Sequence, residues 1–406
     1  MANWGFIVVA VVAALSMLVV FNWRRPVTLH RSVLINRSAQ EIWPSVDYLS
    51  GDFSWQQHFE HAETVADGHV RIFYSLKRDD GSKVAWDLQF EIIDREIGRS
   101  ITVRRTGIDD MQKNDRLLER TIDLEPQENG TRVTFRETWG PRSVTGFALA
   151  HMDAASMLAR LKSWIETGNA KPKGSNGWTS AVISGASLLA TAAAFSLLLG
   201  WEIGAVFVCL LVLHELGHLI SFRMIGQPWG KIIFIPFLGG VAVSRVPHLR
   251  LADDAFCAIM GAGLSVLALL PAIIVSAWQI SSPGIVQLAY VMAAIAGGLN
   301  LLNLLPVFPL DGGRVLRAVM QSFLPKHVRA AMFAVAGMVA IGGVVLQNPV
   351  LVAIAVVAFF QSTRLGPARD GVALMKPYRA SVMCAAYLSL VSLHGAAAVT
   401  YWPSLG

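Results

Sequence analysis

Cysteine is scarce in this sequence of 406 residues. The three cysteines are Cys209, Cys257 and Cys384, and none of them belongs to a Cys-x-x-Cys pair. This excludes a disulfide framework and argues against a zinc site built from thiolates. All three lie in apolar segments, where cysteine behaves as a small hydrophobic residue, so we expect all three to be buried.

Charged residues are also few, at 15% of the chain, whereas average soluble domains carry about 25%. Residues 24–173 hold 22 of the 34 Lys and Arg residues and 22 of the 28 Asp and Glu residues. This neutral block predicts a soluble domain, and the apolar remainder predicts a membrane protein. The excess of +6 belongs to the membrane part, so the charge indicates no nucleic-acid partner.

Long apolar runs flank the soluble block. Residues 4–23 predict an uncleaved transmembrane anchor (1–23), and Arg24 and Arg25 after it place its C-terminal end in the cytoplasm. Further spans are predicted at about 179–200, 203–222, 254–278, 285–306, 328–346, 349–363 and 380–401. Threading them puts the 12 basic residues after position 178 on the cytoplasmic side. We therefore expect a multi-pass protein of the bacterial inner (cytoplasmic) membrane.

Residues 24–170 predict a cytoplasmic α+β domain, followed by a linker at 171–177. A strand at 27–35 precedes a short helix near Ser38, turns are expected at 79–82 and 128–130, and a helix at about 146–168 closes the domain. This order resembles the helix-grip superfamily (START-like, polyketide-cyclase-like domains). The resemblance implies a sheet curled around the last helix, with a cavity for an apolar small ligand within 27–168. A filled core or a protein-docking domain is the alternative interpretation.

The run 203–222 contains His214, Glu215 and His218, spaced as H-E-x-x-H. Ionisable residues at bilayer depth usually have a function. On a helix the two histidines are about 40° and one turn apart, so both imidazoles share one face. They can bind Zn²⁺, and Glu215 is suited to accept a proton from a water molecule at the metal. A pair of core histidines bonded to backbone carbonyls is the alternative.

A hydrolytic zinc site needs a third protein ligand. Asp311 is the best candidate, because Pro306 and Pro309 end the preceding span and the two glycines after Asp311 allow a tight turn. A solvated Asp in a helix-terminating loop is the alternative. Asn303, at the end of the same span, is a candidate to donate to the substrate backbone, or else a helix-packing amide.

The segment 231–244 is apolar but too short to cross as a helix, and Gly239 and Gly240 lie at its centre. It predicts a re-entrant β-hairpin dipping from the cytoplasmic side. An edge strand there can hydrogen-bond an extended peptide, which makes the two glycines candidate substrate-binding residues.

HELGH together with N-x-x-P-x-x-P-L-D-G-G-R at 303–314 resembles the site-2 protease family of intramembrane zinc metalloproteases, over roughly 178–320. The resemblance implies one zinc ion bound by His214, His218 and Asp311, with Glu215 as the catalytic base. The family's G-x-x-x-[NSG] pattern is matched by 261–265. The PDZ and CBS signatures of many members are absent from the sequence, and the soluble domain takes their place.

The sequence thus predicts a polytopic α-helical membrane protein (178–406) with a re-entrant hairpin, an anchor helix and a helix-grip domain. Its predicted function is zinc-dependent hydrolysis of transmembrane proteins or peptides within the lipid bilayer, near their cytoplasmic end, regulated by the soluble domain. Two alternatives remain open. One is a proteolytically inactive, membrane-tethered lipid-binding protein, and the other is a metal transporter.

Overall fold

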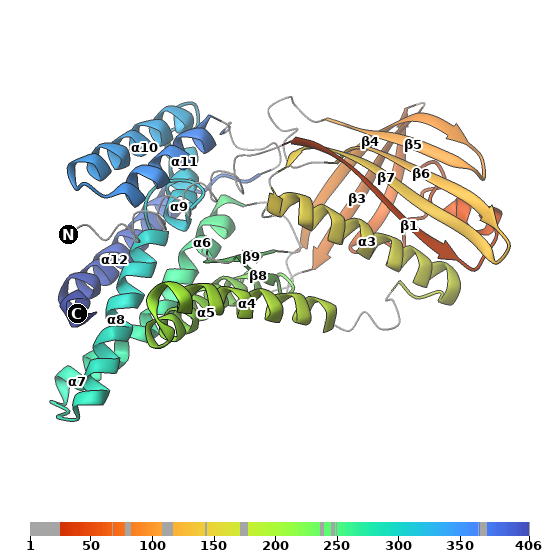
Figure 1. The fold of residues 1–406 in the computed structure, drawn as a ribbon. Helices are drawn as coiled ribbons and strands as arrows, with labels where there is room; N and C mark the ends of the chain where they lie inside the picture. Colours follow the sequence, from red (N-terminus) through yellow and green to blue (C-terminus); the bar gives the residue numbers. More distant parts are fainter. Residues whose placement is uncertain are drawn as a thin grey trace. The chain divides into compact units, whose positions relative to one another are not determined.

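The computed structural model describes residues 25–66, 68–77, 83–107, 117–142, 144–170, 178–235, 239–244, 248, 250–363, 365 and 372–405. The chain divides into two compact units on either side of Trp178/Thr179, here called the sheet unit and the helical unit (Figure 1). The expected anchor at 1–23, the turn at 79–82 and the linker at 171–177 lie outside the described residues.

The sheet unit is built on a seven-stranded antiparallel sheet of order β1-β7-β6-β5-β4-β3-β2. The strands are β1 (Arg25–Ile35), β2 (Phe59–Ala66), β3 (His69–Lys77), β4 (Lys83–Glu96), β5 (Ser100–Thr106), β6 (Leu117–Gln127) and β7 (Gly130–Arg142). A short helix, α2 (Ala39–Ile42), and the long helix α3 (Val144–Thr167) complete the unit, and α3 crosses one face of the sheet (Figure 1). This is the expected order of strand, helix, antiparallel sheet and closing helix.

Local sequence explains these elements. Ser38 accepts from the Glu41 amide, and the Glu41 carboxylate accepts from the Ser38 amide, which caps the start of α2. Alternate residues of β6 are buried, as in Ile122 and Leu124. Gly130 has φ +128°, and a Cβ atom there would lie 2.1 Å from the Ile35 carbonyl oxygen, so only glycine fits between β6 and β7.

The core of the sheet unit lies between the sheet and α3, and large aromatic side chains fill it. Its fully buried members include Tyr48, Phe53, Trp55 and Phe135. It also holds a buried ion pair, in which Arg120 Nη2 lies 2.6 Å from Glu137 Oε1. Burial alone would lower the pKa of Arg120, but the Glu137 carboxylate outweighs burial and raises that pKa above its usual value. The pair therefore stays charged inside the core.

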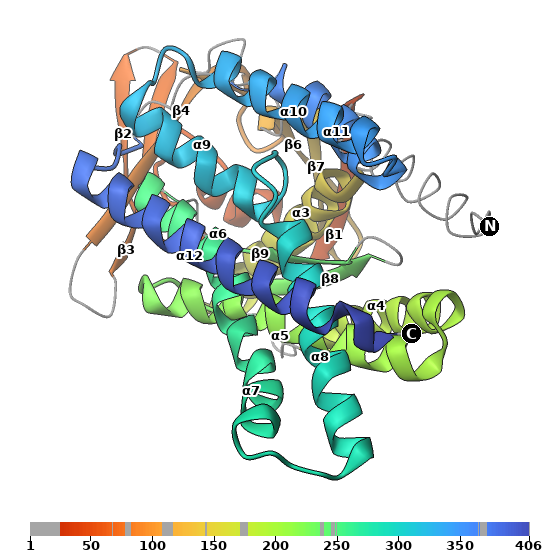
Figure 2. The ribbon, with the colours of Figure 1, turned by 90° about the vertical axis from the view of Figure 1, so that its left-hand side faces the viewer.

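In its described residues, the helical unit contains nine α-helices, two short 3-10 helices and one β-hairpin. Figure 2 shows their arrangement. The helices are α4 (Trp178–Leu199), α5 (Trp201–Met224), α6 (Leu251–Ser265), α7 (Leu270–Ala277), α8 (Pro283–Asn303), α9 (Asp311–Phe323), α10 (Val328–Val345), α11 (Pro349–Ser362) and α12 (Pro377–Tyr401). The hairpin pairs β8 (Lys231–Ile235) with β9 (Gly239–Val243), within the segment expected to form one.

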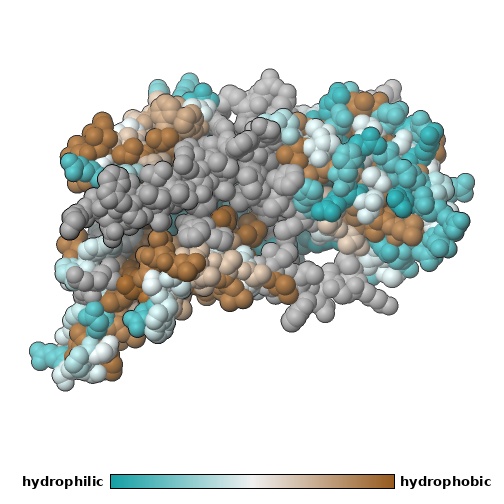
Figure 3. All heavy atoms as spheres, viewed as in Figure 1, coloured by the Kyte–Doolittle hydropathy of each residue, from teal (hydrophilic) through white to brown (hydrophobic). Residues whose placement is uncertain are grey.

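Five described helical segments are long and apolar enough to cross a membrane, which agrees with a multi-pass membrane protein. They are α5, α6 continued into α7, α8, α10 and α12. The span predicted at 349–363 corresponds to α11, whose 14 residues are short for a straight crossing of about 30 Å. Hydrophobic surface gathers over the helical unit and hydrophilic surface over the sheet unit (Figure 3).

Candidate metal centre

His214, Glu215 and His218 lie in the second half of α5, and all three side chains are buried. Helix α6 packs tightly against this part of α5. A Cβ atom on Gly217 would lie 2.1 Å from the Met260 carbonyl oxygen, so the two backbones touch where a larger residue would separate them. The close approach brings α6 to the histidine face of α5.

Asp311 is the first residue of α9. We expected the two glycines after it to form a tight turn, and this is wrong, because α9 begins directly at Asp311. The glycines serve packing instead. A Cβ atom on Gly312 would lie 2.1 Å from the Leu304 carbonyl oxygen, and one on Gly313 would lie 2.2 Å from the Val307 carbonyl carbon. These contacts hold the start of α9 against the end of α8.

These elements bring three side-chain atoms together. The Nε2 atoms of His214 and His218 are 3.2 Å apart, and each lies 3.2 Å from Asp311 Oδ2. Ligands of a tetrahedral zinc ion at about 2.0–2.1 Å lie about 3.3–3.4 Å from one another. The described residues thus bring one three-ligand set together, with spacing and donor types that fit zinc.

The other ring nitrogens of the two histidines determine their tautomers. His218 Nδ1 lies 2.7 Å from the Cys257 carbonyl oxygen, and His214 Nδ1 lies 2.8 Å from Asn300 Oδ1. Asn300 Nδ2 donates to the Ala296 carbonyl (2.8 Å), which turns its Oδ1 toward His214. Both Nδ1 atoms therefore donate, and both Nε2 atoms carry lone pairs. The lone pairs of the two Nε2 atoms and the Asp311 carboxylate oxygen point to one place, and such a group of electron donors is suited to bind a cation.

Arg314 lies against the other oxygen of Asp311. Arg314 Nη1 is 3.5 Å from Asp311 Oδ1, and Arg314 Nη2 donates to Asp254 Oδ1 at 2.7 Å. The guanidinium is thus fixed between two carboxylates from α6 and α9. It restrains Asp311 so that Oδ2, and not Oδ1, faces the histidines.

Gly261 of α6 lies directly beside the two Nε2 atoms. A Cβ atom at this position would lie 2.6 Å from Nε2 of His214 and 2.6 Å from Nε2 of His218. The missing side chain leaves a small space next to the converging ligand atoms. Because a metal ion needs space there, this glycine is part of the site.

Glu215 faces the hairpin. Its Oε2 atom is buried and has no hydrogen-bond partner among the residues that the structure describes, and a Cβ atom on Gly240 would lie 2.6 Å from Glu215 Cγ. A buried, unpaired carboxylate oxygen is costly, which indicates a functional group. Gly239 lies against Leu211 of α5, with 3.6 Å between its Cβ position and the leucine Cδ1.

Asn303 ends α8, and its Nδ2 donates to the Leu299 carbonyl at 3.2 Å. The amide that contacts a histidine is Asn300, one turn earlier and fully buried. The sequence signal for Asn300 is its position as a polar residue within an apolar span. Among the cysteines, the prediction of burial is confirmed for Cys257 but wrong for Cys209, which is exposed, and Cys384 is only half-buried.

We expect removal of the Asn300 carbonyl oxygen to weaken zinc binding. Asn300→Leu should lower zinc affinity about 10- to 100-fold, because His214 loses the acceptor that fixes its tautomer. Asn300→Asp keeps an acceptor oxygen and should retain most of the affinity. Competition with a chromogenic zinc chelator measures both, and equal affinities for the two variants would contradict this role.

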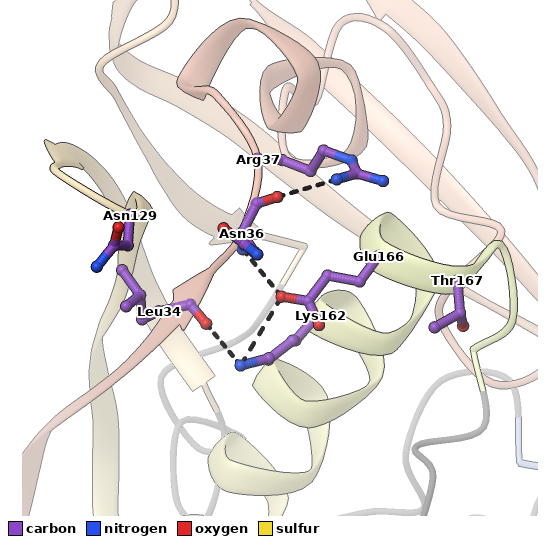
Figure 4. Close-up of a pocket in the computed structure, with 7 residues that line it drawn as sticks. All are labelled: Leu34, Asn36, Arg37, Asn129, Lys162, Glu166 and Thr167. Carbon is purple, nitrogen blue, oxygen red and sulfur yellow. Dashed lines mark hydrogen bonds and ion pairs between the residues drawn. The ribbon is translucent and has the colours of Figure 1, made fainter.

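A cleft of about 590 Å³ lies in the sheet unit, where β1 meets the C-terminal end of α3 (Figure 4). Lys162 Nζ donates to the Leu34 carbonyl (2.8 Å), and the Asn36 amide donates to Glu166 Oε1 (2.9 Å). The lining is thus largely polar, unlike the expected cavity for an apolar ligand. The apolar ligand stays a prediction.

Comparison with known proteins agrees with this geometry. Residues 271–345, which include Asn300 and Asp311, match peptidase family M50. The chain is also 34% identical over 110 residues to zinc metalloprotease MJ0392 of Methanocaldococcus jannaschii. These matches confirm the resemblance to the site-2 protease family. The alignment with the archaeal relative covers 27% of this chain and 31% of that protein, so the chain spans about a third of its length.

Solved structures similar to part of this chain include DR_A0006 of Deinococcus radiodurans, which is 19% identical with a TM-score of 0.25. The match covers 35% of this chain and 99% of that chain. The Aha1 dimer of Colwellia psychrerythraea is 18% identical with a TM-score of 0.26, covering 35% and 98%.

Proposed function

We propose that this protein is an intramembrane zinc metalloprotease that hydrolyses peptide bonds of transmembrane substrates. The observation that carries the proposal is the meeting of His214 Nε2, His218 Nε2 and Asp311 Oδ2 at 3.2 Å beside the buried Glu215. The matches to family M50 and to a zinc metalloprotease support the same reaction class. A metal transporter is less favoured, because the metal-binding residues gather at one site, and the three protein ligands there are the number that a hydrolytic zinc ion needs.

His214, His218 and Asp311 would hold one zinc ion, and the space at Gly261 would receive it. Bound zinc lowers the pKa of a water molecule to about 7 and polarises a carbonyl group. Glu215 accepts the proton of the attacking water on its unpaired Oε2 atom and then returns it to the leaving amine. Asn300 Oδ1 and the Cys257 carbonyl accept from the Nδ1 atoms and keep both imidazoles in the same orientation during the proton transfers.

The scissile segment must leave its helix, because helical carbonyls are already hydrogen-bonded. The β8–β9 hairpin is suited to hold that segment extended, since β-strand addition uses backbone groups of any sequence. Because Gly239 and Gly240 lack side chains, the hairpin backbone lies directly against Leu211 and Glu215, and a strand added to it would lie close to the proposed base. Asn303, at the end of α8, is a further group for the substrate backbone.

We propose the following topology for the chain. Its divisions are an anchor at 1–23, the domain at 24–170, a linker at 171–177 and the protease at 178–406. The 12 basic residues after position 178 lie on the cytoplasmic side, which puts the sheet unit and the site in or near the cytoplasm of a bacterial inner membrane. Cleavage occurs near the cytoplasmic end of the substrate, and the sheet unit regulates it.

Metal removal tests the function. Purified full-length protein should contain one zinc per chain by mass spectrometric metal analysis and should cleave a single-span apolar peptide in liposomes. Treatment with 1,10-phenanthroline should abolish cleavage, and added zinc should restore it. Cleavage that persists without metal would contradict a metalloprotease. Absence of both zinc and cleavage would favour the inactive, membrane-tethered lipid-binding protein.

A further inference from the structure

The β8–β9 hairpin has two outer edges, one on each strand. Helix α4 lies against the outer edge of β8. Ser184 Oγ donates to the Ile232 carbonyl oxygen at 2.6 Å, and the Phe234 amide donates to Ser187 Oγ at 3.2 Å. Ser187 Oγ also donates to the Ser184 carbonyl at 2.9 Å, which ties the two serines together. Two of the backbone groups that β8 turns outward, the Ile232 carbonyl and the Phe234 amide, are therefore already bonded to α4.

The register shows which groups β9 turns outward. Ile232 is paired with Ala242, and Phe234 with Gly240. Directly opposed residues in an antiparallel pair turn their N–H and C=O groups either toward each other or both away. Because Ile232 and Phe234 direct theirs away from β9, Ala242 and Gly240 direct theirs away from β8.

The outward groups of β9 lie on the side of Glu215. The Ala242 backbone amide faces the Glu215 carboxylate, and the Cβ position of Gly240 is 2.6 Å from Glu215 Cγ. The two edges of the hairpin thus differ. The β8 edge is bonded to helix α4, and the β9 edge faces the proposed catalytic base.

We propose that Ser184 and Ser187 are positioning residues that close the β8 edge, so that an extended apolar segment of a transmembrane substrate adds to β9 alone. The proposal rests on the proposed function. An open β8 edge would leave backbone groups unpaired in apolar surroundings or pair with a strand on the side away from Glu215. The two hydroxyls pair with the Ile232 carbonyl and the Phe234 amide of this edge, and so direct the substrate strand to Gly240 and Ala242.

Photocrosslinking with a defined peptide tests the edge choice. The probe is a synthetic single-span apolar peptide with a central Gly-Pro pair and one benzophenone beside it, in liposomes. Crosslinked segments are identified by mass spectrometry in the full-length Glu215→Gln background, which leaves the peptide uncut. We expect crosslinks to β9 only, and crosslinks to both strands once Ser184→Ala and Ser187→Ala are added.

Kinetics with Glu215 intact give the second measurement. The double alanine variant should raise KM for the peptide about tenfold and change kcat less than about twofold, since each lost neutral hydrogen bond is worth about two- to tenfold. Ser184→Thr with Ser187→Thr keeps both hydroxyls and should restore KM. Ser389→Ala is the matched control, because the Ser389 hydroxyl donates to the Ala385 carbonyl of its own helix and, among the described residues, to no group of the hairpin. Zinc content should be equal in all variants.

The outcomes separate the two proposals. Crosslinks to β8 in the parent protein, or an unchanged crosslink pattern in the double alanine variant, would overturn the positioning role even if KM shifts. Unequal zinc content would overturn it as well, because the serines would then support the metal centre. A zinc-loaded protein that binds the peptide but never cleaves it would overturn the proposed function, while the crosslinks would still report the edge.

Discussion

Replacement of Glu215 by glutamine is expected to abolish peptide cleavage while the zinc stays bound. Glutamine has the same shape and fits the tight contact with Gly240, but its amide cannot accept the proton of water. A general base contributes about 10²- to 10⁴-fold, so kcat should fall by at least about 100-fold. Glu215 is not one of the three converging ligands, so one zinc per chain should remain in metal analysis.

Glu202→Gln is the matched control, because Glu202 lies in the first turn of the same helix and is exposed. It should leave both cleavage and zinc content unchanged. Full cleavage by Glu215→Gln would remove Glu215 as the base. Loss of zinc in that variant would instead make Glu215 a metal ligand. A cleavage-deficient, zinc-loaded variant would also retain substrates, which makes it the tool for identifying them.

The sequence predicted the parts of the site that depend on local spacing. A four-residue separation on a helix determines that His214 and His218 face one way, and their Nε2 atoms are indeed 3.2 Å apart. Asp311 lies 93 positions after His218 in the chain, and spacing alone could not relate them. Its chemistry and the family resemblance made it the candidate, and contacts at Gly312 and Gly313 hold the start of its helix against the end of α8.

Roles that depend on distances between helices could not be predicted. Gly261 was part of a small-residue pattern common to many helix pairs, and its place beside both histidines depends on how α6 approaches α5. In the sequence, Asn300 is a single amide within an apolar helix. Its role becomes visible only in the structure, where α8 places its side chain next to His214. The closing of the β8 edge by Ser184 likewise requires the placement of α4.

In the sheet unit, too, local spacing predicted the elements, whereas the packing between them could not be predicted. Alternation predicted β6 and β7, and the spacing of Ala154, Leu158 and Leu161 predicted the buried face of α3. Side-chain alternation reports which face of a strand is buried, but not how fully the space behind it is filled. The aromatic core and the Arg120–Glu137 pair could not be anticipated in this way.

Substitution of Gly261 by alanine is expected to weaken zinc binding strongly through a single added methyl group. The new Cβ atom would lie 2.6 Å from both Nε2 atoms, well inside van der Waals contact. Neither histidine can retreat easily, since His218 Nδ1 is bonded to the Cys257 carbonyl and α6 already touches α5 at Gly217. We expect zinc affinity to fall about 100-fold or more, and cleavage to fall with it.

Gly263→Ala separates this effect from a general change in helix α6. Both glycines lie in the same helix, so each substitution gains similar helix propensity, up to about 1 kcal/mol. The nearest atom to a Cβ on Gly263 is Met260 Sδ at 3.5 Å, an ordinary contact. Gly263→Ala should therefore keep zinc, cleavage and thermal stability. If Gly261→Ala bound zinc as tightly as Gly263→Ala, the metal could not occupy the space between α5 and α6, and the proposed coordination would be wrong.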